Sequence, residues 1–329
     1  MKFGRLPRKA LFGGTLFFLS FVLSFSLNVS FASTKLASQK INILTYSSLL
    51  GEGSLGEWIQ KDPNSPCAKL ECNFIKPHPN RSLFEELRFQ KQNPKAPVDL
   101  VIGIDSTQLS WAQEASLLSS TKILLGESPL VLLVHQKFPA LSKEAKGAAK
   151  ESVGALVRKL KKQIIIQDPR FSALSQTFLS WGLQNKIFSL EEFKNSTARV
   201  FPKWSASYEY FLKSPDLALL TFATSQSYHD CHPGSPATRI LEVDGDFPKY
   251  QEWISPIAAS ENQAAIRDLL KFFQTPKFEK AVSELDWLIP KNGLATTSDC
   301  FKKHIPEPAT EAKAPNFKTY QQWMDSWAL

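Results

Sequence analysis

Aromatic side chains stand at the ends of several predicted elements, and a ring face is a surface that attracts cations. The chain has eight Trp and six Tyr. Tyr46 ends a predicted strand, Trp204 opens a polar and aromatic stretch, Tyr228 follows a buried strand, and Trp287 precedes Leu-Ile-Pro. A ring face holds a cation or flat heterocycle with about 0.5–2 kcal/mol per good contact. The competing interpretation of each ring taken alone is core packing.

A second feature, over residues 163–183, could bind an anion. Three isoleucines at 164–166 are apolar on both faces, as in a buried parallel strand, and Asp168-Pro169-Arg170 ends that strand. Ser172 then precedes an apolar pattern with helical spacing and is a normal N-cap. The free N–H groups of such a helix start can receive a phosphate. Ordinary capping is the alternative.

The sequence shows no pattern typical of a catalytic or metal centre. G-x-S-x-G, H-E-x-x-H and paired Cys/His motifs are absent from it. Asp99, Asp105 and Asp168 are isolated carboxylates, as capping or structural groups are. The cysteine and histidine spacings match no zinc pattern. We therefore expect a binding protein with no metal and no cofactor, and not an enzyme.

The first 32 residues predict a secretory signal peptide. Four basic residues within the first nine positions precede an apolar run from Ala10 to Leu27, and Ser30-Phe31-Ala32 supplies small residues for cleavage. An uncleaved anchor is the alternative, because the apolar run approaches membrane-spanning length. Cleavage after Ala32 would release an exported protein.

The four cysteines fit an exported chain. An even number of cysteines in such a chain favours disulfides. Cys67 and Cys72 flank a predicted turn and form a plausible local pair, which leaves Cys231 and Cys300 to close a long loop.

The distribution of charge shows no nucleic-acid footprint, and we expect no nucleic-acid partner. The net charge of +8 includes the four basic residues of the predicted signal peptide, which the mature chain would lack. The one remaining dense basic run, residues 158–162, is interpreted as a solvated helix face.

Strands and helices alternate along the chain, and this alternation predicts α/β layers. Ser82 with Glu85 forms a capping box before a helix. The predicted strands cover residues 40–46, 72–75, 98–104, 130–134, 164–166 and 217–222. Residues 47–58 are predicted to be a Gly/Ser-rich turn that enters a helix, and residues 82–87 are predicted to start one. The other predicted helices cover residues 108–118, 143–161, 172–183, 264–273 and 317–327.

With these elements assigned, the sequence resembles the bacterial periplasmic thiamine-binding proteins, which are solute receptors of ABC importers. The resemblance covers most of the mature chain and is clearest at residues 44–46, 101–105, 166–170, 204–208, 225–229 and 287–290. It implies an α/β, two-lobed periplasmic-binding-protein-like fold (type II) with the ligand cleft between the lobes. Lobe 1 would hold residues 33–126 and 247–329, and lobe 2 would hold residues 127–246.

The resemblance also implies the ligand-binding residues. Family positions that stack on the ligand rings match Tyr46, Tyr228 and Trp287. Family positions that face a phosphate match Ser82, Ser172 and Trp204.

Three positions depart from the family pattern. The aspartate after the first-strand tyrosine is Ser47 here, an Asp-Tyr-Gly motif is Gly126-Glu127-Ser128, and a phosphate-side tyrosine is Phe222. Loss of a carboxylate removes an attractive charge from a cation site. Glu127 and Glu52 are the candidates to replace it, and we expect looser binding or a shifted preference.

The predicted function is that of a monomeric periplasmic receptor. It would bind thiamine, a thiamine phosphate or a related cationic heterocycle and deliver it to an inner-membrane ABC permease. Two alternatives stay open: a receptor of the same fold that takes a different ligand and serves a sensor, and an exported hydrolase.

Overall fold

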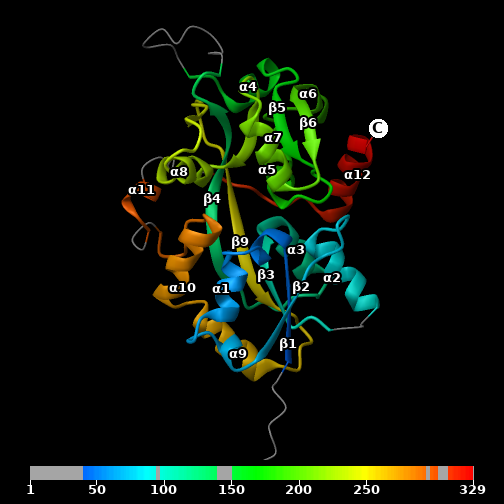
Figure 1. Ribbon diagram of the computed structural model, residues 1–329. Helices are drawn as coiled ribbons and strands as arrows, with labels where there is room; N and C mark the ends of the chain where they lie inside the picture. Colours follow the sequence, from blue (N-terminus) through cyan, green and yellow to red (C-terminus); the bar gives the residue numbers. More distant parts are fainter. Residues whose placement is uncertain (1–39, 94–96, 139–149, 294–296, 303–309, 329) are drawn as a thin grey trace, which may run out of the picture. The chain divides into compact units, whose positions relative to one another are not determined.

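The computed structural model describes residues 40–93, 97–138, 150–293, 297–302 and 310–328 (Figure 1). The predicted signal peptide, residues 1–32, and the first part of the predicted helix at 143–161 lie outside the described residues.

The described strands form one sheet in the order β2-β1-β3-β9-β4-β7-β5-β6, with β10 beside β9 and β8 beside β4. All six predicted strands are present within it. The strands are β1 (Lys40–Thr45), β2 (Glu71–Ile75), β3 (Leu100–Asp105), β4 (Ile123–His135), β5 (Ile164–Gln167), β6 (Thr197–Phe201), β7 (Ala218–Phe222), β8 (Thr238–Ile240), β9 (Pro248–Pro256) and β10 (Thr310–Glu311).

Strand β4 belongs to both halves of this sheet. Its first part, from Ile123 to Pro129, pairs antiparallel with β9, and its second part pairs antiparallel with β7 from Leu130 onward. Figure 1 shows β4 and the yellow β9 side by side, with β1–β3 next to the lower part of this pair and β5–β6 near its upper part. Parallel pairing within each half, as in β1 with β3 and β5 with β7, is expected for α/β units.

Helices connect these strands. They are η1 (Ser47–Leu50), α1 (Leu55–Lys61), η2 (Pro66–Ala68), α2 (Leu83–Gln92), α3 (Ser106–Glu114), α4 (Val153–Lys159), α5 (Ala173–Gln184), α6 (Leu190–Ser196), α7 (Trp204–Leu212), α8 (Thr224–Cys231), α9 (Gln263–Phe272), α10 (Pro276–Ala281), η3 (Val282–Asp286), α11 (Asp299–Lys302) and α12 (Phe317–Ala328).

Burial follows the pattern that the sequence predicts for parallel strands. All four residues of β5 are buried, because β6 and β7 pair along its edges and apolar side chains cover both of its faces. Ile164 and Ile166 lie in one apolar cluster, whereas Ile165 points to the other face and packs with Phe211 and Leu219.

Both predicted disulfides are present. Cys67 pairs with Cys72 beside β2, and Cys231 at the end of α8 pairs with Cys300 in α11. Their Cα atoms lie 5.4 and 5.6 Å apart, within the usual range.

The C-terminal helix α12 contacts both predicted lobes. Tyr320 donates its hydroxyl proton to the carbonyl of Pro169, and the indole of Trp327 lies 6.0 Å from the ring of Phe193 on α6. The indole of Trp111 on α3 donates to the carbonyl of Pro315, just before α12. The lobe boundaries therefore stay a prediction. Of the helices in the described ranges, none is both long and apolar enough to cross a membrane.

Candidate ligand-binding site

A cavity of about 690 Å³ lies where several strands end and several helices begin. Its size suits a small organic molecule, since ligand pockets hold about 300–1,000 Å³. Tyr46 follows β1, Phe222 ends β7, and Gln167 ends β5. The starts of α2, α5, α7 and α8 complete the lining, as expected at the ends of strands in α/β sheets.

Seven of the eight side chains chosen from the sequence line this cavity. They are Tyr46, Ser82, Ser172, Trp204, Phe222, Tyr228 and Trp287. Glu127 is the exception. Its carboxylate accepts hydrogen bonds from Lys249 at 3.3 Å and Gln251 at 3.0 Å, so the ammonium group of Lys249 already balances its charge. Glu52, the other candidate carboxylate, is exposed and is not among the lining residues.

The acidic groups of the cavity are instead Glu252 on β9 and Asp286 at the end of η3. The Tyr46 hydroxyl lies 2.8 Å from Oε2 of Glu252 and 3.1 and 3.0 Å from the two carboxylate oxygens of Asp286. Tyr250 donates its hydroxyl proton to the other Glu252 oxygen at 2.8 Å. Burial, followed by the charge of Asp286, raises the pKa of Glu252 well above its usual range, and burial raises the pKa of Asp286 to about 6.

Gly103 allows the ring of Tyr46 to lie against β3. A Cβ atom at residue 103 would stand 2.1 Å from Cε1 of Tyr46, and Gly103 has a φ of +84°. It also interrupts the register between β3 and β9, where a bulge falls between Ile102 and Ile104. A glycine is therefore required here both for its backbone conformation and for the space.

Replacing Gly103 with alanine should destabilise the protein more than replacing Gly53 does. Both glycines have positive φ, but a Cβ at Gly53 meets no atom within 4 Å. Gly53→Ala should cost about 1 kcal/mol of backbone strain. Gly103→Ala should add roughly 1–3 kcal/mol because Tyr46 must move. Urea denaturation measures both, and equal losses would contradict the proposed packing of Tyr46.

Tyr228 and Trp287 form an aromatic part of the lining, and Trp287 directly follows Asp286 in the chain. The rings of Tyr228 and Trp287 meet edge to face, with centroids 4.9 Å apart and an interplanar angle of 83°. His232 stacks on Tyr228 at 4.2 Å, and Phe301 stacks on Trp287 at 5.7 Å. Since Tyr228 and Trp287 contact each other, they form one continuous surface and leave no slot between them for a ligand ring.

The backbone at Trp287 is unusual. Asp286 ends the π-helical turn η3, and Trp287 adopts the left-handed conformation with φ 56° and ψ 35°. Such a conformation costs a non-glycine residue roughly 1 kcal/mol, and π turns are frequent at functional sites. Two residues later, Ile289 exchanges two 2.8 Å backbone hydrogen bonds with Glu127. Glu127 therefore fixes the chain beyond Trp287 through its backbone.

Helix starts form the part of the lining that could receive an anion. The first turns of α2, α5 and α7 contribute Leu83, Ala173 and Ser205 to the cavity. Uncapped N–H groups at a helix start attract negative charge. Lys203, which precedes α7, and Arg81, which precedes α2, add cationic side chains to the lining.

The side chains expected to face a phosphate are largely engaged within the protein. Ser82 forms the predicted capping box with Glu85, which uses its hydroxyl. The indole of Trp204 donates to Thr221 at 3.1 Å. The prediction that the Ser172 side chain caps its helix is wrong. The hydroxyl donates a hydrogen bond to the side-chain oxygen of Gln167 at 3.3 Å and makes no hydrogen bond to α5. The backbone N–H groups of α5 are consequently left uncapped by a side chain.

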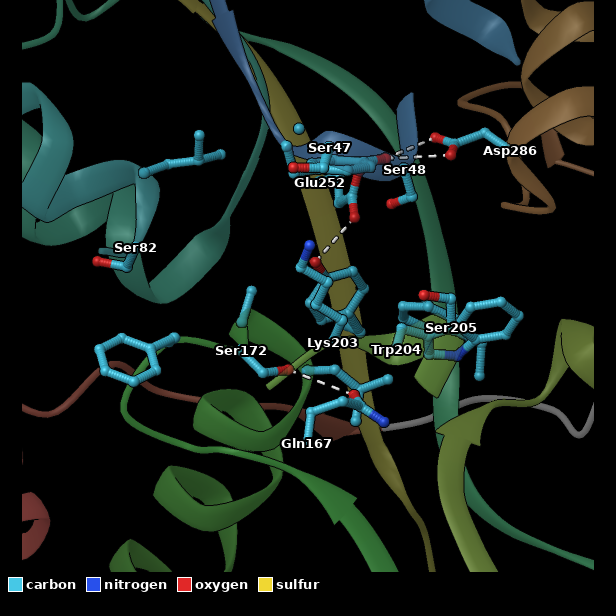
Figure 2. A pocket seen from close by; sticks show the side chains of 18 of the residues that line it. Ser47, Ser48, Ser82, Gln167, Ser172, Lys203, Trp204, Ser205, Glu252 and Asp286 are labelled. Atoms are coloured by element: carbon cyan, nitrogen blue, oxygen red, sulfur yellow. Dashed lines mark hydrogen bonds between the residues drawn. The ribbon is translucent and has the colours of Figure 1, made fainter. Parts of the chain in front are cut away.

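Figure 2 shows these two kinds of lining on different sides of the cavity. Glu252 and Asp286 lie with Ser47 and Ser48 on one side, and Gln167, Ser172, Lys203 and Trp204 lie on the other. Sequence reasoning missed the acidic pair. Asp286 precedes the chosen Trp287 directly, and that adjacency was the one available signal.

Comparison with known proteins identifies the fold. The fold is that of the periplasmic solute-binding proteins with two lobes. The chain matches the structure of a periplasmic thiamin binding protein with a TM-score of 0.72 and 21% identity, over 88% of this chain and 95% of that one. A ferric binding protein from Campylobacter jejuni matches with a TM-score of 0.67 and 13% identity, over 87% and 98%. The chain thus has the fold of the periplasmic solute-binding proteins.

The particular relatives are those that the sequence resemblance indicated. The thiamine-binding periplasmic protein of Haemophilus influenzae is 21% identical over 317 residues, which are 91% of this chain and 94% of that protein. That resemblance is confirmed. No family model matches the chain.

Proposed function

We propose that this protein is the receptor of an ABC importer for thiamine, its phosphates or a closely related cationic heterocycle. The observation that carries the proposal is the division of the cavity lining. The carboxylates of Glu252 and Asp286 stand beside Tyr46 on one side, and the starts of α5 and α7 with Lys203 stand on the other. A ligand with a cationic ring and an anionic tail would satisfy both sides at once.

The acidic pair takes the place of the family aspartate that is absent at Ser47. The family aspartate is missing at that position, but Glu252 and Asp286 supply negative charge beside Tyr46, which directly precedes Ser47. A carboxylate close to a bound cation contributes attraction that a serine hydroxyl cannot. The preference for a cation is therefore retained through different residues.

The anionic side should discriminate weakly between phosphorylation states. Ser82 and Trp204 use their donors internally, and Phe222 has no hydroxyl. A neutral hydrogen bond contributes about 0.5–1.5 kcal/mol net, so three missing donors reduce the advantage of a phosphate considerably. Backbone N–H groups and Lys203 remain to hold one.

Titration of tryptophan fluorescence tests this function. The protein is titrated with thiamine, thiamine monophosphate, thiamine diphosphate and pyrithiamine, in which a pyridinium ring replaces the thiazolium. We expect saturable binding of all four, with affinities within roughly tenfold of one another because stacking tolerates ring identity. Absence of saturable binding for all four would refute the proposed ligand class.

A further inference from the structure

The contacts of Tyr46 need one more proton than the phenol can provide. Its hydroxyl has a single proton but lies within hydrogen-bonding distance of Glu252 at 2.8 Å and of Asp286 at 3.0 Å. Ionised carboxylates accept hydrogen bonds and cannot donate them. With both groups ionised, one of the two contacts would bring two acceptors together. Both contacts become hydrogen bonds when Glu252 and Asp286 hold one proton between them.

The groups packed around the pair supply no compensating cation. Tyr250 on the same strand donates to Glu252, and Asp105 at the end of β3, whose own pKa burial raises to about 7, raises the pKa of Glu252 further. Lys249 pairs with Glu127, and Arg81 pairs with Glu86. Among the described residues, neither Glu252 nor Asp286 takes part in an ion pair with a basic side chain.

The ligand side of the pair is open. Both carboxylates line the cavity with Tyr46, although Glu252 is only 4% exposed. Removing a charged group from water is unfavourable unless a partner of opposite charge replaces the water. A bound cation would be such a partner, and it would favour the fully ionised pair.

We propose that Glu252 and Asp286 are the cation-anchoring residues of the site and that a cationic ligand displaces the proton held between them. The inference rests on the proposed function, because it requires a cationic ligand. The charges balance: the empty pair has one proton and one negative charge, and the occupied pair has two negative charges against one positive ligand charge. The displaced proton enters the solvent.

The direction of the two pKa shifts agrees with this exchange. Burial and the charge of Asp286 raise the pKa of Glu252 well above its usual range, a direction that favours protonated Glu252, whereas Asp286, with a pKa of about 6, is mostly ionised at pH 7. Acidification to pH 5 protonates Asp286 as well, and the ionised fraction of this group falls about tenfold. The release of one proton lowers the affinity about tenfold per pH unit, and the protonation of Asp286 adds about another tenfold. Affinity for a cation should therefore fall about a thousandfold between pH 7 and pH 5.

Calorimetry counts the proton directly. Protein purified after export is titrated with thiamine at pH 7 in PIPES and in Tris, two buffers with very different ionisation enthalpies. The difference in binding enthalpy should correspond to the release of about one proton per thiamine bound. This measurement uses the wild-type chain and does not depend on whether a variant folds.

Variants then assign the proton to the pair. Asp286→Asn and Glu252→Gln should each bind thiamine at least about tenfold more weakly, because one attractive charge is lost. Each should also lose the buffer-dependent enthalpy. Glu284→Gln is the matched control, since Glu284 lies on the same turn η3, is exposed and pairs with Lys280. It should leave both quantities unchanged.

The outcomes separate the two proposals. Thiamine binding by the wild type with equal enthalpy in both buffers would overturn the proton exchange and leave the receptor function standing. No binding by the wild type would overturn the receptor function, and the anchoring role would fall with it. Unchanged affinity and unchanged proton release in both folded variants would remove Glu252 and Asp286 from the site.

Discussion

Replacing Cys231 and Cys300 with serine is expected to lower the free energy of unfolding by about 4 kcal/mol. The two cysteines are 69 residues apart, and a disulfide that closes a loop of this length restricts the unfolded chain strongly. In the folded protein the bond joins α8, which contains Tyr228, to α11, where Phe301 stacks on Trp287. Denaturation by guanidinium chloride, followed by circular dichroism, measures the loss.

The second disulfide is the internal control for this prediction. Cys67 and Cys72 are five residues apart, so Cys67→Ser with Cys72→Ser should cost only about 2 kcal/mol. Neither of these cysteines lines the cavity, so this pair of substitutions should leave ligand affinity unchanged. A larger loss from the short loop than from the long one would contradict the loop-entropy explanation.

Replacing Trp287 with alanine is expected to weaken thiamine binding by more than about 1 kcal/mol, or about fivefold or more. A stacked or edge-on aromatic contact contributes about 0.5–1.5 kcal/mol beyond the area that it buries, and a cation adds to this. Trp287 also forms the aromatic surface with Tyr228 and follows Asp286 directly. Its removal therefore affects both the contact with Tyr228 and the position of Asp286. Fluorescence of the remaining tryptophans or calorimetry can measure the affinity.

A tryptophan outside the cavity shows whether the effect is local. Trp58 on α1 stacks on Phe272 at 5.8 Å and is not among the lining residues. Trp58→Phe should reduce stability without changing thiamine affinity. Wild-type affinity in both Trp287→Ala and Tyr228→Ala, with the fold intact, would mean that the ligand binds elsewhere.

The aromatic part of the site could be predicted because it depends on positions along single elements. Tyr46 directly follows an apolar strand, and such strands are recognisable from composition alone, whereas Phe222 is indicated by the resemblance to the family. Ser172 likewise begins a helix whose apolar spacing is regular. These positions need no knowledge of how distant segments pair.

The acidic pair could not be predicted, because distant segments create it. Glu252 and Asp286 are 206 and 240 residues from Tyr46 in the sequence. Strand β9, which carries Glu252, begins and ends with proline and alternates polar with aromatic residues, so it does not resemble a buried strand. Its register against β3 and β4, with a bulge in each pairing, turns Glu252 toward Tyr46.

Side-chain hydrogen bonds set a second limit on prediction. The sequence places Ser172 and Trp204 at helix starts, but it does not indicate that Gln167 and Thr221 engage their polar atoms. Several orientations of a hydroxyl or an indole are compatible with the same helix start. The neighbouring strands β5 and β7 decide between them.

Native mass spectrometry of the protein purified from its own periplasm tests the central claim most directly. Gentle ionisation should show one bound small molecule per chain, with the mass of thiamine, a thiamine phosphate or another aromatic cation. Thiamine added to protein stripped of its ligand should restore a one-to-one complex, and Asp286→Asn should reduce its occupancy. A bound metal ion or sugar phosphate that thiamine does not displace would contradict the account.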